Sequence, residues 1–513
     1  MSSVQKYTPL STIKSEWDTL TNEFKLNGAI PISDRLKLMK KFKTNLSLFK
    51  DELCDSLLRD FHRSVQETIV MEYGCVVDEI ESFISNLESW LKPETPDFYS
   101  AAFVTISAKI EKCPYGVLLI CAPFNYPLQL SLVPLVGAIC SGNKVVLKLP
   151  TDRCPSFCDT LTKLLNETFN DKVLSVVNGS VKETELLLNL KFDKILFTGS
   201  TKVGYIVAKA AAKNLTPTIL ELGGKSPCFI TPNHGDLEVT ARRCLWGKFA
   251  NSGQTCVAID YILAEDSIYD NVVSTFTKVA SKLFNGELTE NDDFTHIINT
   301  DSYTRLLKTI SDTKGEIVYG GLGDTKKAAS ACGSNFIKPT IIKNVKWDDS
   351  TMKFENFGPI LPILKYSDLK IAVEEVKRNH DTPLALYIFS NDESEQNLIK
   401  NSIRSGAVGI NEVLMHAGLG SVPFGGIGES GMGYYHGKYS VDSFTFKKPV
   451  YKQPFITEAL IDVRYPPYSK KKTDRFLLMS KLPSLPAIKL DFVSLVLIGV
   501  AFVIGAFSGS FYN

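Results

Sequence analysis

Several features that the sequence lacks narrow its possible functions. Its 57 lysines and arginines are balanced by 56 acidic residues, and the net charge of +1 gives no indication of nucleic acid as a partner. No CxxC pair occurs among the 11 cysteines, and the six histidines show no HExxH spacing. Scattered cysteines of odd number are typical of reduced thiols in a cytosol-facing protein. They argue against a disulfide framework and against a structural zinc site.

Long apolar runs are also scarce, with one exception near the C-terminus. The N-terminal MSSVQKYTPL has no apolar core and predicts no secretory signal. Residues 492–513 carry no charged side chain, and residues 492–507 read FVSLVLIGVAFVIGAF. A helix over the whole uncharged span would be roughly 33 Å long, enough to cross about 30 Å of hydrocarbon. We predict a membrane anchor over residues 491–513, with an interfacial helix and a buried core helix as the alternatives.

Between the termini the hydrophobic pattern changes once, near residue 115. Residues 17–91 read as helices, with apolar side chains at three- and four-residue spacing. Short apolar runs then alternate with helical stretches, which predicts βαβ units and a parallel sheet covered on both faces. A second series of this kind runs from residue 226 to about residue 411. The strands expected are residues 117–122, 144–149, 173–177, 194–197, 218–222, 261–264 and 385–390.

A small-residue turn predicts an anion-binding site. The stretch FTGSTKVG, residues 197–204, follows an apolar strand and opens an alanine-rich helix. Free N–H groups and the helix dipole at such a helix N-terminus favour a phosphate. The glycine spacing is GxxxxG rather than the GxGxxG of the usual dinucleotide fingerprint, so a simple tight turn is the alternative.

Three further residues stand where chemistry is possible. Cys256 ends the turn-forming stretch NSGQTC, although a lone cysteine is usually a small buried apolar residue. Glu221 follows an apolar run and precedes two glycines, so it is either a partly buried functional carboxylate or a surface one. Asn125, in PFNYP, could donate toward developing negative charge or could simply form a turn.

Together these stretches resemble the aldehyde dehydrogenase superfamily. The resemblance covers about residues 11–447 and rests on the ordered set PFNYP, FTGSTKVG, LELGGKSP, GQTC, ENFGPILP and PFGGIGESGMG. It is greatest for the class 3 branch, and within it for the membrane-bound enzymes that act on long-chain fatty aldehydes. The stretches WGK, LALY, VLMH, YHGK and RYPP support this narrower likeness.

The resemblance implies a fold and a division of the chain. The fold class is α/β, with two tandem open parallel α/β domains, a β-strand bridging arm and a C-terminal membrane helix. The parts expected are an NAD(P)-binding Rossmann-like domain over residues 1–221, a catalytic domain over 222–416, a return segment and oligomerisation arm over 417–455, a basic proline-containing connector over 456–490 and the anchor over 491–513.

The resemblance also implies a mechanism. Cys256 attacks the aldehyde as a thiolate and forms a thiohemiacetal, and hydride transfer to the nicotinamide then leaves a thioester. The Asn125 amide and the Cys256 N–H form the oxyanion hole. Glu221 activates the water that releases a carboxylic acid, and it can help to deprotonate Cys256. No metal is needed.

For the cofactor, NAD with NADP possible, the resemblance implies a specific set of contacts. The pyrophosphate turn comprises Gly199, Ser200 and Gly204, whereas Glu355 and Phe357 contact the nicotinamide side. Lys148 reaches the adenine ribose. Relatives usually read Lys-Pro-Ser-Glu here, but this chain reads KLPTD over residues 148–152. Because Asp152 replaces the usual glutamate with a one-residue shift, the choice between NAD and NADP is open.

Substrate, partners and location are implied less directly. Met415 and His416 fall where the fatty-aldehyde branch has its substrate funnel, with a satisfied polar turn as the alternative for His416. Basic residues before the tail predict a catalytic part on the cytosolic side of an endoplasmic reticulum, lipid-droplet or mitochondrial outer membrane. We also expect a homodimer that uses residues 444–449. The rival functions are an aromatic-aldehyde or semialdehyde dehydrogenase, a catalytically silent scaffold, and a cysteine-dependent esterase or acyltransferase.

Overall fold

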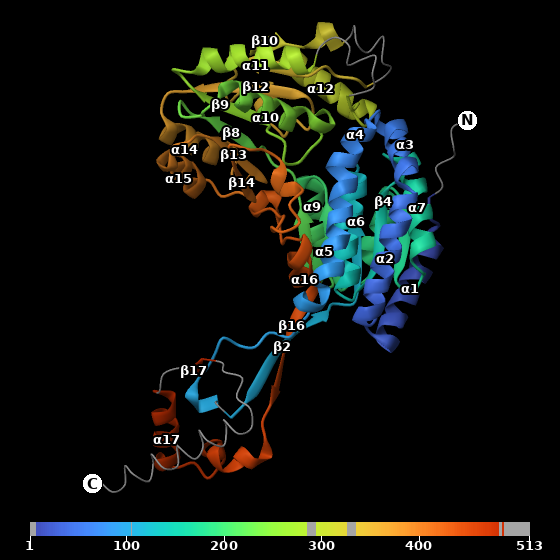
Figure 1. The fold of residues 1–513 in the computed structure, drawn as a ribbon, viewed down its shortest axis with the longest axis vertical. Coiled ribbons are helices and arrows are strands. Elements are labelled where there is room, and N and C mark those ends of the chain that lie inside the picture. Colours follow the sequence, from blue (N-terminus) through green and yellow to red (C-terminus); the bar gives the residue numbers. More distant parts are fainter. Residues whose placement is uncertain (1–6, 104, 285–293, 326–334, 482–484, 487–513) are drawn as a thin grey trace. The chain divides into compact units, whose positions relative to one another are not determined.

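The chain divides into two compact units. The computed structural model describes residues 7–103, 105–284, 294–325, 335–481 and 485–486. One unit comprises Met1–Trp90 with Pro114–Thr445, and the other comprises Leu91–Cys113 with Phe446–Asn513 (Figure 1). The first unit contains both large sheets.

The first large sheet has six strands in the order β15-β7-β6-β3-β4-β5. The pairs among β7, β6, β3, β4 and β5 are parallel, and β15 joins β7 in the antiparallel direction. The VLLIC run of β3 is buried throughout, as expected for a strand covered on both faces. The strands are β3 (Val117–Cys121), β4 (Lys144–Pro150), β5 (Leu174–Gly179), β6 (Lys194–Thr198), β7 (Thr218–Glu221) and β15 (Gly431–Met432).

Helices from three parts of the chain cover this sheet (Figure 1). Every residue of α6 is buried, and α5, α2 and α16 pack against it. The helices are α1 (Leu10–Asn27), α2 (Ile32–Leu48), α3 (Lys50–Phe61), α4 (Val65–Thr68), the π-helix η1 (Ile69–Tyr73), α5 (Gly74–Trp90), α6 (Pro127–Cys140), α7 (Pro155–Thr168), α8 (Val181–Asn189), α9 (Thr201–Ala212) and α16 (Gly437–Phe444).

The second large sheet has seven strands in the order β10-β11-β12-β9-β8-β13-β14. Only the edge pair of β10 and β11 is antiparallel among its described pairs. Its strands are β8 (Pro227–Ile230), β9 (Tyr261–Glu265), β10 (Glu316–Tyr319), β11 (Thr340–Lys343), β12 (Ile360–Tyr366), β13 (Ala385–Phe389) and β14 (Ala407–Ile410). The longer helices beside it are α10 (Leu237–Phe249), α11 (Tyr269–Leu283), α12 (Thr300–Asp312), α14 (Leu369–Asn379) and α15 (Glu393–Ser402).

The second unit is small and built around two-stranded pairs. β2 (Ser107–Pro114) lies beside β16 (Thr445–Lys452), and β1 (Phe98–Tyr99) pairs with β17 (Leu485–Pro486). It also contains α17 (Lys470–Ser480). Large apolar side chains are exposed on this unit, among them Phe98, Tyr451, Phe455, Ile456 and Tyr468.

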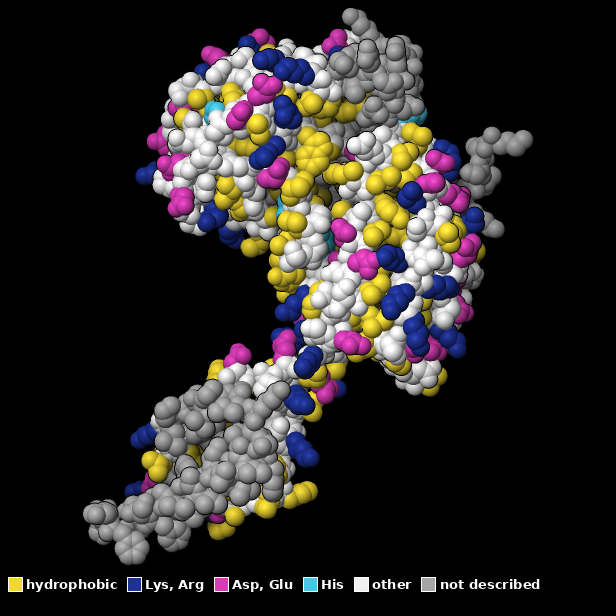
Figure 2. Space-filling model, viewed as in Figure 1, with side chains coloured by type: hydrophobic (Ala, Val, Ile, Leu, Met, Phe, Trp, Pro, Cys, Tyr) yellow, Lys and Arg dark blue, Asp and Glu magenta, His cyan; other side chains and the backbone are white. Residues whose placement is uncertain are grey.

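The prediction of two parallel, helix-covered α/β sheets is confirmed. The seven predicted strands are present, with ends that agree to within two residues. The predicted membrane helix at residues 491–513 lies outside the described residues. Within the described ranges, no helix has the length and apolar character needed to span a bilayer. Figure 2 shows acidic and basic side chains interspersed over the visible face, in keeping with the balanced charge.

Candidate active site

A strained loop presents Cys256 to the interior of the first unit. Asn251, Ser252 and Gly253 have φ angles of 53°, 53° and 72°, in the left-handed region that non-glycine residues rarely adopt. A Cβ at Gly253 would lie 2.4 Å from the carbonyl oxygen of Gly358. Such strain persists only where the surrounding structure holds it. The NSGQTC stretch therefore forms a fixed loop rather than a flexible one.

The side chain of Gln254 does much of this holding. Its amide nitrogen donates to the carbonyl oxygen of His296 at 3.0 Å, and its amide oxygen accepts from the N–H of Ile298 at 3.0 Å. Gln254 is buried, so these bonds replace those that water would otherwise make. The residue two positions before Cys256 is thereby tied to a separate segment of the chain.

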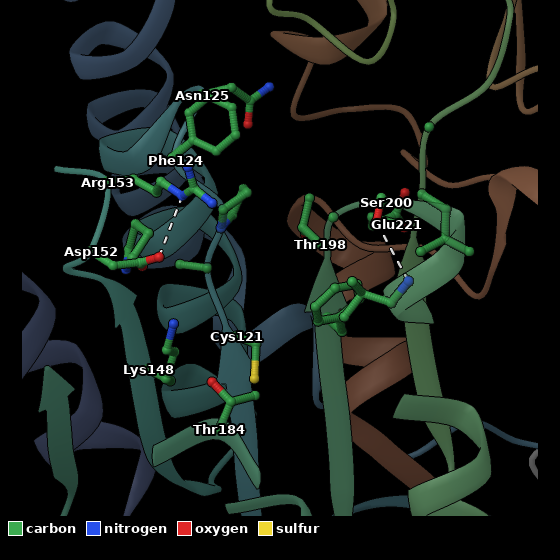
Figure 3. Close-up of a pocket in the computed structure, with 18 of the residues that line it drawn as sticks. Cys121, Phe124, Asn125, Lys148, Asp152, Arg153, Thr184, Thr198, Ser200 and Glu221 are labelled. Carbon is green, nitrogen blue, oxygen red and sulfur yellow. Dashed lines mark hydrogen bonds and ion pairs between the residues drawn. The ribbon is translucent and has the colours of Figure 1, made fainter. Parts of the chain in front are cut away.

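Cys256 lines two cavities at once. The larger cavity has a volume of about 700 Å³ and is also lined by Asn125, Lys148 and Glu221 (Figure 3). The smaller cavity has a volume of about 370 Å³ and is mostly apolar. A molecule in either cavity can therefore contact the same cysteine residue.

The Cys256 thiol and the Glu221 carboxyl group both have raised pKa values. Burial, followed by the charges of Glu355 and Glu221, raises the pKa of the Cys256 thiol to about 12. Glu221 is 2% exposed, and neither of its carboxyl oxygens has a hydrogen-bond partner among the described residues. Burial alone raises the pKa of Glu221 well above its ordinary value of 4.5. An unpartnered buried carboxyl group on a cavity wall is available to substrate or water.

Asn125 follows β3, and hydrogen bonds hold both its side-chain amide and its backbone carbonyl group. Its side-chain nitrogen donates to the carbonyl oxygen of Gln254 at 3.0 Å. Its own carbonyl oxygen accepts from the Asn251 side chain at 2.8 Å. Since a primary amide carries two N–H groups, one donor is left for a ligand beside Cys256. The structure thus brings together Cys256, Asn125 and Glu221, which the sequence separates widely.

A buried ion pair that sequence reasoning missed supports this arrangement. Arg63 and Glu72 are both fully buried and paired. Arg63 also donates to the carbonyl oxygen of Asn125 and to the side-chain oxygen of Asn251, each at 2.5 Å. Glu72, in the π-helix η1, accepts from two N–H groups at the start of α6 at 2.7 and 3.0 Å. A buried charge needs such a set of partners.

The larger cavity fits a dinucleotide. Ser200 caps α9 by accepting from the N–H of Val203, and Gly199 and Ser200 line the cavity beside this helix N-terminus. Aligned N–H groups at a helix N-terminus suit a pyrophosphate. The side-chain oxygen of Thr198, also on the wall, is buried without a partner among the described residues. Gly204 does not line the cavity, and a Cβ there would lie 2.6 Å from the Leu222 side chain.

Glu355 and Phe357 line the same cavity. The loop that carries them is held by hydrogen bonds to buried charged residues. The N–H of Asn356 donates to Asp260, which is also paired with Lys225. Phe357 has a φ of 47°, and its ring packs edge-on against that of Phe124, with ring centroids 6.0 Å apart. Burial, followed by the charge of Asp260, raises the pKa of Glu355 to about 8.

The smaller cavity contains one of the two predicted funnel residues. Met415 lines it, whereas the ring of His416 stacks on Phe424, with ring centroids 5.9 Å apart. Burial lowers the pKa of His416 to about 4, so the ring is neutral. His436, which sequence reasoning did not single out, is 3% exposed and does line the cavity.

Comparison with known proteins identifies the class to which this fold and site belong. The sequence model of the aldehyde dehydrogenase family matches residues 13–450. The chain therefore belongs to the aldehyde dehydrogenase family, as its motifs predicted. Members of this family oxidise aldehydes and use NAD(P) as the hydride acceptor.

Individual relatives place the chain near the class 3 branch. A fatty aldehyde dehydrogenase of Saccharomyces cerevisiae is 37% identical over 498 residues, which cover 94% of this chain and 92% of that protein. A dimeric, NADP-preferring aldehyde dehydrogenase of Canis lupus familiaris is 34% identical, with 86% of this chain and 95% of that protein covered. The substrate-bound structure of Staphylococcus aureus AldH superposes with a TM-score of 0.86 at 35% identity, covering 91% of this chain and 99% of that one.

Proposed function

We propose that this chain oxidises long-chain apolar aldehydes to carboxylic acids, with the Cys256 thiol as the nucleophile and NAD or NADP as the cofactor. The observation that carries the proposal is the position of Cys256 on both cavities. A nucleotide in the larger cavity and an aldehyde in the smaller one would meet at the same sulfur atom. This is the geometry that a cysteine-dependent hydride transfer requires.

The larger cavity would hold the cofactor by the residues that line it. Gly199 and Ser200 at the start of α9 would take the pyrophosphate, Lys148 the adenosine ribose, and Glu355 with Phe357 the nicotinamide side. When bound, the nicotinamide ring accepts the hydride that leaves the substrate carbon. Gly204 contributes indirectly, because its lack of a Cβ lets α9 approach Leu222.

The reaction begins with the removal of the thiol proton. At neutral pH the Cys256 thiol is un-ionised, since its pKa is raised to about 12. Glu221, as a carboxylate, would take that proton, directly or through a water molecule. The thiolate then adds to the carbonyl carbon and gives a thiohemiacetal whose oxygen carries the negative charge. The free N–H of the Asn125 amide and the backbone N–H of Cys256 would stabilise that oxygen.

The second half of the reaction releases the product. Oxidation leaves a thioester on Cys256, and water must attack its carbonyl carbon. Glu221 would accept a proton from this water, because its carboxyl group faces the cavity with no hydrogen-bond partner among the described residues. Hydrolysis returns the thiol and a carboxylic acid. Since both Glu221 and Cys256 have raised pKa values, we expect the rate to increase as the pH rises above neutrality.

The smaller cavity favours an apolar substrate. Its described lining includes no lysine or arginine that could hold the carboxylate of a semialdehyde. Its wall is formed largely by apolar and aromatic side chains, including Val70, Met71, Leu130, Trp246, Leu414 and Phe424. Burial of each further CH₂ group of an alkyl chain is worth about 0.8 kcal/mol. Aromatic aldehydes are the second candidate, because the tyrosine, tryptophan and phenylalanine side chains could stack on an aromatic ring.

We also propose that the apolar tail anchors the enzyme to a membrane, with its catalytic part in the cytosol, and that the enzyme is a dimer. The tail lies outside the described residues. The support for the anchor comes from the apolar sequence of the tail and from the basic segment before it. The exposed apolar side chains of the second unit and the edge strand β16 support the dimer. Deletion of residues 491–513 should prevent the enzyme from floating with liposomes in a flotation assay. Sedimentation should give the mass of a dimer. A floating truncated enzyme or a monomer would contradict the respective proposal.

The test of the proposed function is the reduction of NAD and NADP by the purified full-length chain with hexadecanal, butanal and benzaldehyde. Wild type should reduce a cofactor fastest with hexadecanal. Cys256→Ala should remove the signal, whereas Cys113→Ala, a partly buried thiol outside both cavities, should retain it. No reduction with any aldehyde would favour a scaffold or an acyl-transfer protein.

A further inference from the structure

Two segments that lie far apart in the sequence form parts of the wall of the smaller cavity. One is Cys256 with Val257, and the other follows β14 and contains Leu414 and Met415. Val257 and Leu414 are both buried. Leu414 has a φ of 62°, in the left-handed region that a bulky side chain rarely adopts. Such a backbone persists only where neighbouring groups hold it in place.

The hydroxyl group of Tyr387 joins these two segments. Tyr387 lies on β13 and is fully buried. Its hydroxyl donates to the carbonyl oxygen of Val257 at 2.6 Å and accepts from the N–H of Leu414 at 3.3 Å. A phenolic hydroxyl has one hydrogen to donate, and the bond to Val257 uses it. Tyr387 is not among the residues that line either cavity, so its effect on the site passes through the residues that it contacts.

The second large sheet, rather than the two segments themselves, fixes the position of this hydroxyl. β13 lies between β8 and β14 and pairs with both in the parallel direction, with Tyr387 opposite Cys228 on one side and Gly409 on the other. A Cβ at Gly409 would lie 2.8 Å from the Tyr387 ring, so the ring packs directly on that strand. Burial raises the pKa of Tyr387, so the hydroxyl keeps the proton that it donates.

We propose that Tyr387 is a positioning residue that holds Cys256 at a fixed place relative to the apolar wall that includes Leu414. The inference rests on the proposed function, since it concerns how the same site presents an aldehyde to its nucleophile. The bond to Val257 restrains the residue next to Cys256, and the bond to Leu414 restrains a strained backbone. An alkyl chain that packs on this wall then places its carbonyl carbon within reach of the thiol. Small misplacements of reacting atoms slow a reaction strongly.

Tyr387→Phe tests this inference because it removes the hydroxyl and keeps the ring. The full-length variant would be mixed with hexadecanal or butanal and with the cofactor that wild type reduces faster, and the burst of reduced cofactor would give the rate of the first turnover. With hexadecanal this rate should fall by about tenfold while the half-saturating aldehyde concentration changes by less than about twofold, because the chain still binds but its carbonyl is misplaced. With butanal the rate should fall by less than about threefold, because a short chain makes few contacts with the apolar wall.

Tyr269→Phe is the matched control, because Tyr269 makes the same pair of hydrogen bonds elsewhere. It is the first residue of α11 and is also buried, and its hydroxyl donates to the carbonyl oxygen of Ile363 at 3.2 Å and accepts from the N–H of Asn344 at 2.7 Å. It lines neither cavity. Both variants should lower the melting temperature, because each leaves a carbonyl oxygen and an N–H without this partner. Only Tyr387→Phe should change the rates of the first turnover.

Hydrogen exchange followed by mass spectrometry measures the same contact without turnover. In Tyr387→Phe, peptides that contain residues 413–415 should exchange faster than in wild type, because the N–H of Leu414 loses its partner. In Tyr269→Phe, exchange in these peptides should equal that of wild type.

The inference can fail separately from the proposed function. An unchanged rate of the first turnover in Tyr387→Phe would overturn it, and so would an equal loss with both aldehydes or an equal loss in Tyr269→Phe. Unchanged exchange at residues 413–415 would show that Tyr387 does not hold this segment. Wild type that reduces no cofactor with any aldehyde would instead contradict the proposed function itself.

Discussion

Cys256, Glu221 and Glu355 hold their protons more tightly than the free side chains do, because each is removed from water. Burial is the largest cause for all three, and the two carboxylates add to the effect on the thiol by their charges. A site of this kind would keep the proposed nucleophile, Cys256, un-ionised until a base acts on it. Proton removal, rather than a low thiol pKa, is therefore the step on which activity should depend.

Arg63 should be needed for both stability and turnover. Arg63→Met would leave Glu72 buried without its counter-charge, which typically costs about 3–5 kcal/mol. Arg63→Lys keeps the charge but cannot reach Glu72 and Asn125 with the same planar fork, so it should lower kcat by about tenfold with little change in KM. Urea unfolding and steady-state rates would measure the two effects. An Arg63→Lys enzyme with wild-type kcat would show that the ion pair does not position Asn125.

Glu79 gives the fold a dependence on pH. It is 2% exposed and accepts a hydrogen bond from the N–H of Gly437 at 2.8 Å, and burial raises its pKa from 4.5 to about 8. Between those values the folded chain keeps the proton that the unfolded chain loses. The free energy of unfolding should therefore fall with rising pH, by up to about 1.4 kcal/mol per pH unit from this group.

Glu79→Gln tests this because glutamine preserves the accepting oxygen and cannot ionise. The variant should gain stability over wild type as the pH rises from 5 to 8, as measured by urea unfolding at each pH. Glu88→Gln, at an exposed position of the same helix, is the matched control and should show no such gain. A constant difference between Glu79→Gln and wild type would contradict the assignment.

Single residues differed in how far the sequence could predict them. Cys256, Glu221 and Asn125 were recognisable because their neighbours form motifs, and the structure brings them together. Arg63 and Glu72 carry no such signal, since a charged residue in a helical region is usually solvated. Their pairing depends on how η1 packs against α6, and no local pattern records that.

At the scale of elements, the loop before Cys256 is the most constrained part of the site. Asn251, Ser252 and Gly253 have consecutive positive φ angles, and the close approach of Gly253 to Gly358 leaves no room for a side chain at Gly253. Because this loop also carries the proposed nucleophile, its backbone strain and the position of the thiol are linked.

Gly253→Ala should therefore impair the enzyme more than other glycine substitutions. Left-handed backbone alone costs about 1–2 kcal/mol for alanine, and the contact with Gly358 adds to it. Gly28→Ala isolates the backbone strain, because φ is 65° and nothing lies within 4 Å, and Gly323→Ala has neither strain nor a close neighbour. Thermal unfolding and kcat/KM should rank the losses as Gly253, then Gly28, then Gly323. Equal losses would contradict the account of the loop.

The elements themselves were predictable where their pattern is local. The buried strands of both sheets have short apolar runs, and the helices that follow have a helical periodicity. The antiparallel β15 was not predictable, because it pairs with β7 from far along the chain through the contact of Gly431 with Glu221. The π-helix η1 was missed because one extra residue in a turn leaves the apolar spacing almost unchanged.

At the scale of the whole molecule, family membership was predictable because six ordered motifs span most of the chain. The presence of two parallel α/β sheets was predictable from the alternation of strands and helices along the sequence. The dimer and the membrane anchor remain predictions, since they depend on a partner subunit and on the tail. The specific aldehyde is also a prediction, because it depends on loops from several elements that meet only in the folded chain.

The most direct test of the account is to trap the covalent intermediate. Glu221→Gln should block hydrolysis while leaving attack by Cys256 possible at high pH, so hexadecanal and NAD together should leave an acyl group on the protein. Mass spectrometry of proteolytic peptides should find the added acyl mass on Cys256 alone, and only when both ligands are present. Cys75, which lines the same apolar cavity, is the internal comparison. Two results would contradict the central claim. One is an acyl group on Cys75. The other is a Glu221→Gln variant that acquires no acyl group on Cys256 although the wild-type enzyme turns over.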